Sequence, residues 1–273
     1  MIKLFQVLFL IFFATSAFAK QEPYPGQFVY GNIGPYGLDT EILLPPGEWI
    51  VAGVSTSNGG IRWAEIILLQ TESKKIKALL NIKYPRKLEE RIGKSSGGNH
   101  KEGWRRDKHF DNNTCDDYDR QNSNYHETLI KKRLGGQRII AATCISIYAN
   151  NSINEYSNLN SEAWNLAHEY IGRSDLIYPN TLVNIDSTYF KLNNVVHLYF
   201  SINPDFANIT SSKDTSFKYS EWNKYNIKKY ADKNDFMNNT INIGLSVLSD
   251  NKRKFSKNRR LDLTQYNYLI QNK

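Results

Sequence analysis

The chain has 273 residues, of which 40% are hydrophobic and 13% aromatic, and its formal net charge is +8 at pH 7. This length and apolar content suit one generous domain or two small ones with a sizeable core, which excludes a disordered chain. Beyond residue 19, no stretch approaches the roughly 18 unbroken apolar residues of a membrane-spanning helix, so we predict no transmembrane segment after that point.

Residues 1–19 contain the three parts of a secretory signal peptide in order. Lys3 supplies the positive charge, residues 4–13 form an apolar run, and Ala17-Phe18-Ala19 is an A-x-A cleavage motif. The apolar run is about half as long as a membrane-spanning helix, which favours cleavage over a retained anchor. Cleavage would leave 273 − 19 = 254 residues with a net charge of 34 − 27 = +7. We therefore expect a periplasmic or extracellular protein, and the cleavage region favours the periplasm.

The mature chain contains two cysteines, Cys115 and Cys144. In an oxidising compartment an even pair of cysteines typically forms a disulfide. The bridge would close a loop of about 30 residues and contribute about 3–4 kcal/mol in the chain-entropy model. The alternative is a free reactive thiol.

The first elements of the mature chain are extended. Residues 20–37 are rich in Pro, Gly and Tyr and predict a surface arm. Pro45-Pro46-Gly47 is typical of a turn, and the β-branched and aromatic residues of 48–54 predict a strand. Two apolar runs then flank the polar residues 71–75, which indicates a hairpin. Residues 48–84 are thus predicted as a three-stranded unit.

A long polar segment, 86–124, separates this unit from the next strand. A structureless loop of this length is unusual in a compact domain, so we expect it to be anchored, with Trp104 and Cys115 as the anchors. The apolar residues 138–149 predict a buried strand that carries Cys144. The disulfide would therefore join the long loop to a core strand.

The second half of the chain mixes helices and strands. Apolar spacing over 158–173, with Ser161 three residues ahead of Trp164, predicts an amphipathic helix. Residues 181–190 and 195–202 predict two strands joined by a hairpin turn. Residues 220–250 predict one or two helices, broken near Lys233-Asn234.

Hairpins rather than βαβ alternation predict an α+β fold. We expect a mainly antiparallel β-sheet with hairpins, packed by two to three helices, with one disulfide. Residues 20–250 would form a single domain, because the bridge between Cys115 and Cys144 spans its middle, and residues 251–273 would form a basic C-terminal tail.

The acidic, His-containing segment 107–127 is the first candidate site. Together with the nearby tryptophan, its candidate binding residues are Trp104, His109, Asp111, Asp116, Asp117, Asp119 and His126. Carboxylate oxygens are ligands for Ca²⁺, but the EF-hand spacing fails: with Asp111 as position one, position six is Asp116 rather than Gly, and position twelve is Asn122 rather than Glu. We therefore predict no metal and no cofactor, and interpret the segment as a solvated acidic loop.

Catalytic motifs are missing from the sequence. The two His-Glu dipeptides lack the second histidine of the zinc-protease helix, and there is no G-x-S-x-G elbow, Walker sequence or C-x-x-C pair. His168 on the predicted helix is interpreted as a packed histidine. A hydrolytic pair of His197 with Asp186 or Glu169 would require tertiary contacts. We identify no catalytic residue from sequence.

Two basic clusters, 105–108 and 251–260, remain without a role. Export argues against a nucleic-acid partner, whereas an anionic envelope component or another exported protein is compatible with the charge. The alternative for 251–260 is a solvated tail. Aromatic residues are numerous enough to line a carbohydrate or peptide groove, although most fall at core positions.

These observations favour a non-enzymatic binding or envelope-associated accessory module over an enzyme. The competing hypothesis is a small exported hydrolase or metal-dependent enzyme that uses the loop 107–127 with His197 or His168.

Overall fold

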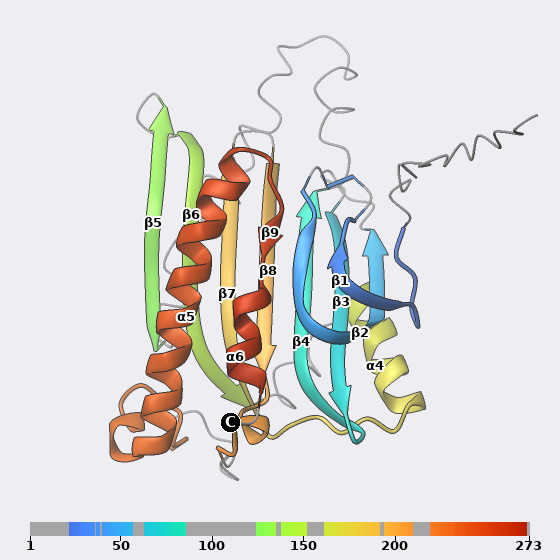
Figure 1. The fold of residues 1–273 in the computed structure, drawn as a ribbon, viewed down its shortest axis with the longest axis vertical. Coiled ribbons are helices and arrows are strands. Elements are labelled where there is room, and N and C mark those ends of the chain that lie inside the picture. Colours follow the sequence, from blue (N-terminus) through green and yellow to red (C-terminus); the bar gives the residue numbers. More distant parts are fainter. Residues whose placement is uncertain are drawn as a thin grey trace, which may run out of the picture.

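The computed structural model of the protein describes residues 22–35, 37–38, 40–56, 63–85, 124–134, 138–151, 161–191, 194–209 and 219–271. In these residues nine strands form one sheet in the order β1-β2-β3-β4-β8-β7-β6-β5, with β9 beside β2 (Figure 1). All neighbouring strands are antiparallel except the short β2–β9 pair. The predicted α+β fold with a mainly antiparallel sheet and two to three helices is confirmed.

The bounds of the elements follow the chain. The strands are β1 (Phe28–Ile33), β2 (Ile42–Thr56), β3 (Trp63–Glu72), β4 (Lys75–Pro85), β5 (Tyr125–Leu134), β6 (Arg138–Asn151), β7 (Thr181–Lys191), β8 (Asn194–Ile202) and β9 (Leu261–Asp262). The helices are α4 (Glu162–Arg173), α5 (Ala231–Ser256) and α6 (Asn267–Ile270), with 3-10 turns η2 (Pro204–Ala207), η3 (Ile227–Lys229) and η4 (Thr264–Tyr266).

Several local predictions are confirmed. The three strands expected in 48–84 are present, and the β3–β4 hairpin turns at Ser73 and Lys74, which both have positive φ, as a two-residue type I′ turn requires. The strand carrying Cys144 is β6, and the expected hairpin near residue 190 joins β7 to β8. Helix α4 begins after Ser161, whose hydroxyl accepts a hydrogen bond from the backbone N–H of Trp164.

The two faces of the sheet are covered by different helices. On one face α5 packs against β6 and β7, and Gly244 brings it so close that an added Cβ would lie 3.0 Å from Ile147 and 3.1 Å from Ile145. On the other face α4 packs against β2 and β3. The approach of α4 depends on Gly53, because a Cβ on Gly53 would lie 1.9 Å from the carbonyl oxygen of Ala163.

Residues 28–33, expected within a surface arm, instead form the edge strand β1 against β2. The pairing is irregular, because Tyr30 lies opposite Glu48 whereas Asn32 lies opposite Leu43. Residues 44–47, including the expected Pro-Pro-Gly turn, therefore face the single residue Gly31. Gly31 and Gly47 both have positive φ, which a residue without a Cβ adopts at little cost.

The expected break near Lys233-Asn234 is wrong: α5 runs through it without interruption. Lys233 is buried, and its ammonium lies 3.1 Å from Glu221 and over the ring of Tyr230. This paired ammonium lets a lysine occupy an inward-facing position in the first turn. Strand β5 lies where the sequence has no apolar alternation, and no strand was expected there. None of the described helices is long and apolar enough to span a membrane.

The expected basic tail is instead built into the fold. Residues 251–256 complete α5, and β9 then pairs with β2. The residues that follow α5 and fill the core are Leu261, Leu263, Tyr266, Leu269 and Ile270, each at most 1% exposed. The basic side chains of 252–260, which come just before these residues, obscure the apolar pattern in the sequence.

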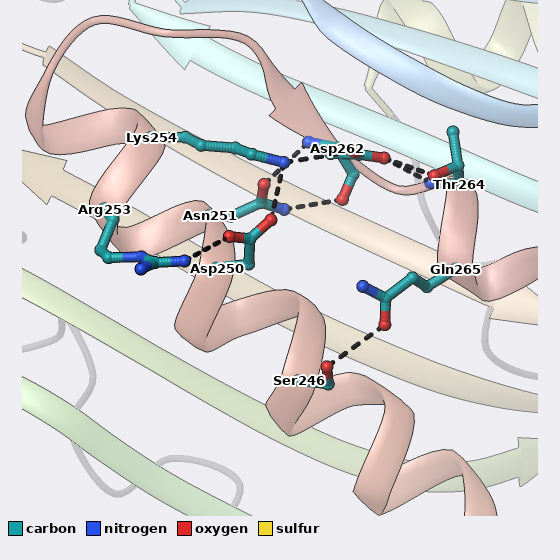
Figure 2. Close-up of polar contacts among 8 residues, drawn as sticks. All are labelled: Ser246, Asp250, Asn251, Arg253, Lys254, Asp262, Thr264 and Gln265. Atoms are coloured by element: carbon teal, nitrogen blue, oxygen red, sulfur yellow. Dashed lines mark hydrogen bonds and ion pairs between the residues drawn. The ribbon is translucent and has the colours of Figure 1, made fainter.

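A polar network fastens the end of α5 to β9 and η4 (Figure 2). Asn251 donates from Nδ2 to the carbonyl oxygen of Asp262 at 2.9 Å and accepts from its backbone N–H at 2.7 Å. The Asp262 carboxylate accepts from the backbone N–H and hydroxyl of Thr264 and lies 3.1 Å from the Lys254 ammonium. Lys254 also lies 2.7 Å from Asp250. The network thus holds three consecutive elements together.

These contacts shift the pKa values of the ionisable side chains in the network. Burial alone would raise the pKa of Asp262, but the hydrogen bonds from Thr264 and Lys254 outweigh it and hold this pKa below the usual 3.8. Hydrogen bonds from Lys254 and Arg253 likewise lower the pKa of Asp250. Burial opposes the charge on Lys254, yet its two carboxylate partners raise its pKa.

We predict that Gly53→Ala lowers the free energy of unfolding by at least about 3 kcal/mol, because the new methyl group would overlap backbone atoms of α4 that cannot rotate away. The matched control is Gly172→Ala, at an exposed helical position with no neighbour within 4 Å. This control should gain up to about 1 kcal/mol from helix propensity. Urea denaturation measures both, and equal stabilities of the two variants would contradict the close packing of α4.

We predict that Asp262→Asn lowers the free energy of unfolding by about 1–2 kcal/mol at neutral pH, because charge-assisted hydrogen bonds are lost. A lowered folded-state pKa stabilises the protein above the unfolded-state pKa and loses this effect as the pH falls through the folded-state value. The difference from wild type should therefore shrink below pH 3.8.

Arg253→Gln provides the control for this measurement, since the Arg253 side chain is 78% exposed and its ion pair with Asp250 should contribute less than about 0.5 kcal/mol. A pH-independent loss in Asp262→Asn, measured by urea denaturation over an acid pH series, would refute the role of the carboxylate charge.

Candidate functional site

A polar surface lies on the sheet face opposite α5. On this face α4 makes its main contacts with β2 and β3, and its apolar cluster also includes Ile76 and Leu79 of β4 and Leu182 of β7. The described helices make no comparable contacts with the rest of this face, over β4, β8, β7, β6 and β5. Side chains alternate between the faces of a strand. In β7, Val183, Ile185 and Tyr189 enter the α5 core, whereas Asp186 and Thr188 point to the opposite face. We call this surface the polar face.

One row of the polar face crosses five strands. The register places His126, Ser146, Asp186, Tyr199 and Asn81 side by side on β5, β6, β7, β8 and β4. The Nδ1 atom of His126 lies 2.7 Å from the Ser146 hydroxyl. Ser146 and Asn81 are buried, as is the Nε2 atom of His126, whereas the side chains of Asp186 and Tyr199 are half-buried. Asp186 and Tyr199 are therefore the members of the row that a bound molecule can reach.

A second row lies on the same face, two residues away from the first along β7, β8 and β4. Thr188, His197, Lys83 and Glu65 are opposite one another on β7, β8, β4 and β3. The Thr188 hydroxyl lies 2.9 Å from Nδ1 of His197. The rows are linked, because the Asn81 amide donates to Glu65 at 2.8 Å. Three of these four side chains thus have a hydrogen-bonding partner on the face.

Aromatic and small apolar side chains border the rows at one end. Trp63 stacks at a tilt against His197, with ring centroids 5.7 Å apart, and the Lys83 ammonium lies 5.8 Å from the Trp63 ring centroid. Trp63 also packs against a small cluster that contains Cys144 and Phe190. At the other end, Ser201 donates to Asn184 at 2.6 Å.

Most of the residues that sequence singled out lie outside the described part of the chain. These are Trp104, His109, Asp111, Cys115, Asp116, Asp117 and Asp119. His126 is described, and it belongs to β5 rather than to a loop. Within the described residues, no group of three or more His, Cys, Asp or Glu side chains could hold a metal ion. Of the segment 107–127, which we predicted to bind no metal, residues 107–123 lie outside the described part of the chain.

The remaining histidines fall in different surroundings. His168 is packed between Trp164 and Tyr178, and its Nδ1 lies 2.9 Å from the Tyr178 hydroxyl, as expected for a packed histidine. His197 lies on the polar face, diagonal to Asp186 in the register. Glu169 instead forms an ion pair with Arg173 on the exposed side of α4.

Sequence reasoning did not select Ser146, Thr188, Asn184 or Tyr199. The signal was present as alternation: in β7, polar residues at 184, 186 and 188 interleave with apolar residues at 183, 185 and 189. Such alternation indicates a half-buried strand. It does not reveal that four further strands present polar residues at the same level as Asp186, because that depends on long-range register.

Two chemistries are compatible with this arrangement. Hydroxyl, amide and imidazole groups both donate and accept hydrogen bonds, so the polar face can bind a ligand with many such groups. A serine beside an imidazole is also the start of nucleophilic catalysis. However, Ser146 lies within β6 between paired strands, so its backbone is engaged in the sheet rather than available as an oxyanion hole.

Comparisons of the chain with protein-family models, with curated proteins and with solved structures find no match.

Proposed function

We propose that the protein is an exported, non-enzymatic binding module that holds a neutral, hydroxyl-rich ligand, such as a glycan segment, on the polar face. The observation that carries this proposal is the row of His126, Ser146, Asp186, Tyr199 and Asn81 across five adjacent strands. Neighbouring strands lie about 4.8 Å apart, so the row spans about 19 Å, enough for several sugar rings.

The chemistry of the row favours hydroxyl groups over charged ones. A sugar hydroxyl both donates and accepts a hydrogen bond, as do the hydroxyls of Ser146 and Tyr199 and the amide of Asn81. A phosphate or carboxylate ligand would require several cations, and Lys83 is the one lysine or arginine that we place in the two described rows. Trp63 at the end of the second row offers an aromatic ring on which a sugar can stack.

The competing function is a serine hydrolase built on Ser146 and His126, which the 2.7 Å contact favours. The paired backbone of Ser146 argues against it, because a developing oxyanion needs preorganised N–H donors. The acidic residue of the row, Asp186, lies opposite Ser146 on the side away from His126, so it is not placed to orient the imidazole.

Export and the disulfide belong to the same proposal. Residues 1–19 would be removed as a signal peptide, and Cys144 would pair with Cys115. Cys144 is 6% exposed and opposite Thr188 on the polar face, and it is the one cysteine in the described residues. A bridge at this position would bring residue 115 to the polar face and place the acidic loop near the proposed ligand.

We predict that Asp186→Asn and Tyr199→Phe each weaken glycan binding about tenfold, the effect of one lost hydrogen bond of about 1.4 kcal/mol. Isothermal titration calorimetry would follow soluble chitotetraose and maltotetraose as probes. Asp175→Asn and Tyr268→Phe make the same chemical changes at positions that are exposed and away from the polar face, and should bind as wild type.

Three outcomes would count against the binding proposal. The first is no measurable binding of either oligosaccharide, and the second is equal losses in the site variants and their controls. The third is labelling of the wild type, but not of Ser146→Ala, by a fluorophosphonate probe, which would establish the hydrolase instead.

We predict that protein recovered from the periplasm begins at Lys20 and has no free thiol. Intact-mass spectrometry before and after alkylation under denaturing conditions measures both features. The Cys115→Ser variant is the control and should expose one alkylatable thiol, Cys144. Two free thiols in the native exported protein would exclude the disulfide, and an uncleaved N-terminus would exclude removal of the signal peptide.

A further inference from the structure

The end of α5 carries a concentration of positive charge. Residues 252–260 contain six basic side chains. Lys191, at the end of β7, lies beside them and donates from Nζ to the carbonyl oxygen of Ser256 at 2.7 Å. The described acids in contact with this group are Asp250, Asp262 and Glu41. The local net charge is therefore 7 − 3 = +4, more than half of the +7 of the mature chain.

The acids neutralise particular members of the group. Asp250 pairs with Arg253 and Lys254, Asp262 with Lys254, and Glu41 with Arg260. Three basic side chains, Lys252, Lys257 and Arg259, form no ion pair with another described residue. Lys257 and Arg259 are exposed and Lys252 is half-buried. We call these three the basic triad.

The backbone that carries the basic triad is held in place. Asn251 and Asp262 bond to each other through two hydrogen bonds, and they bracket the triad in the chain (Figure 2). Phe255 is buried against Tyr189, and Leu261 is fully buried next to β2. The charges are therefore presented at fixed positions rather than on a mobile tail, which reduces the entropy lost on binding.

We propose that this end of α5 docks on the surface of an anionic phospholipid membrane, with the basic triad contacting the phosphate head groups. Lys257 and Arg259 are exposed and Lys252 is half-buried, and the three are spread over the end of α5 and the link to β9, an arrangement that suits a surface of many anions. A single bound anion would instead require buried, convergent donors. Each basic residue near an anionic membrane contributes roughly 1 kcal/mol. That the protein meets such a membrane outside the cytoplasm rests on the proposed export. Membrane binding by the basic triad does not require ligand binding on the polar face.

The test uses sedimentation of the mature protein with vesicles of phosphatidylglycerol and phosphatidylcholine. Wild type should bind these vesicles, release them at high salt, and not bind pure phosphatidylcholine. The variant Lys252→Gln/Lys257→Gln/Arg259→Gln should bind about 100-fold more weakly.

The matched control is Lys224→Gln/Lys228→Gln/Lys229→Gln, which removes the same charge at the N-terminal approach to the same helix. It should bind within about twofold of wild type. Thermal unfolding of both variants checks their folds. If the triple variant does not fold, the single variant Lys257→Gln, at an exposed site, replaces it and should show a partial loss of binding.

Equal losses in the two triple variants would show a dependence on net charge alone and overturn the proposal. So would equal binding to neutral vesicles, or complete competition by millimolar inorganic phosphate, which would indicate a discrete anion site. Oligosaccharide binding by the triad variant is expected to be unchanged. The membrane proposal and the polar-face proposal can therefore be refuted separately.

Discussion

The pairing of β4 with β8 is the contact on which the rest of the structure depends. Six residue pairs join the two strands, from Ala78 with Ile202 to Lys83 with His197. In the sequence the first pair is 202 − 78 = 124 positions apart and the last is 197 − 83 = 114 positions apart. On one side of this seam lies the sequential meander β1–β4, and on the other lie β5–β8. Without this pairing, the strands β1–β4 and β5–β8 would not be joined into one continuous sheet. The loop-closure entropy of so distant a pairing must be offset by the core that it completes.

The C-terminal residues reinforce the seam from the α5 side. Phe200 of β8 packs against Tyr266 at a ring separation of 4.6 Å and against Trp49 of β2 at 6.1 Å. Residues from β2, β8 and the chain terminus therefore meet in one core. On the opposite face the same seam aligns Tyr199 with Asn81 and His197 with Lys83. The two rows of the polar face exist as continuous rows because β4 and β8 are neighbours.

Sequence patterns predicted the elements whose signals are local. Alternation and turn residues located β2, β3, β4, β6, β7 and β8, and the cap at Ser161 located α4. Edge strands were missed because β1 and β5 have one strand neighbour each and need less apolar alternation. The C-terminal segment was interpreted as a tail because its charges are conspicuous, whereas its core residues are spaced irregularly.

The candidate site was predicted poorly for a related reason. The acidic loop drew attention because its candidate ligands are adjacent in sequence, yet the two rows of the polar face are assembled from residues on six strands. Alternation shows which side chains share a face of one strand, and only the register shows which ones are neighbours. His126 belongs to both interpretations, and its contact with Ser146 places it in the sheet.

The irregular pairing at Gly31 has a consequence for the protein's behaviour at high concentration. An edge strand with a regular row of free amides and carbonyls is a template for fibre growth. In β1 the regular pairing is interrupted after three residues, and Gly31 bends the strand where a foreign chain would need straight backbone. The exposed rings of Phe28 and Tyr30 thus lie on an edge that resists ordered self-assembly.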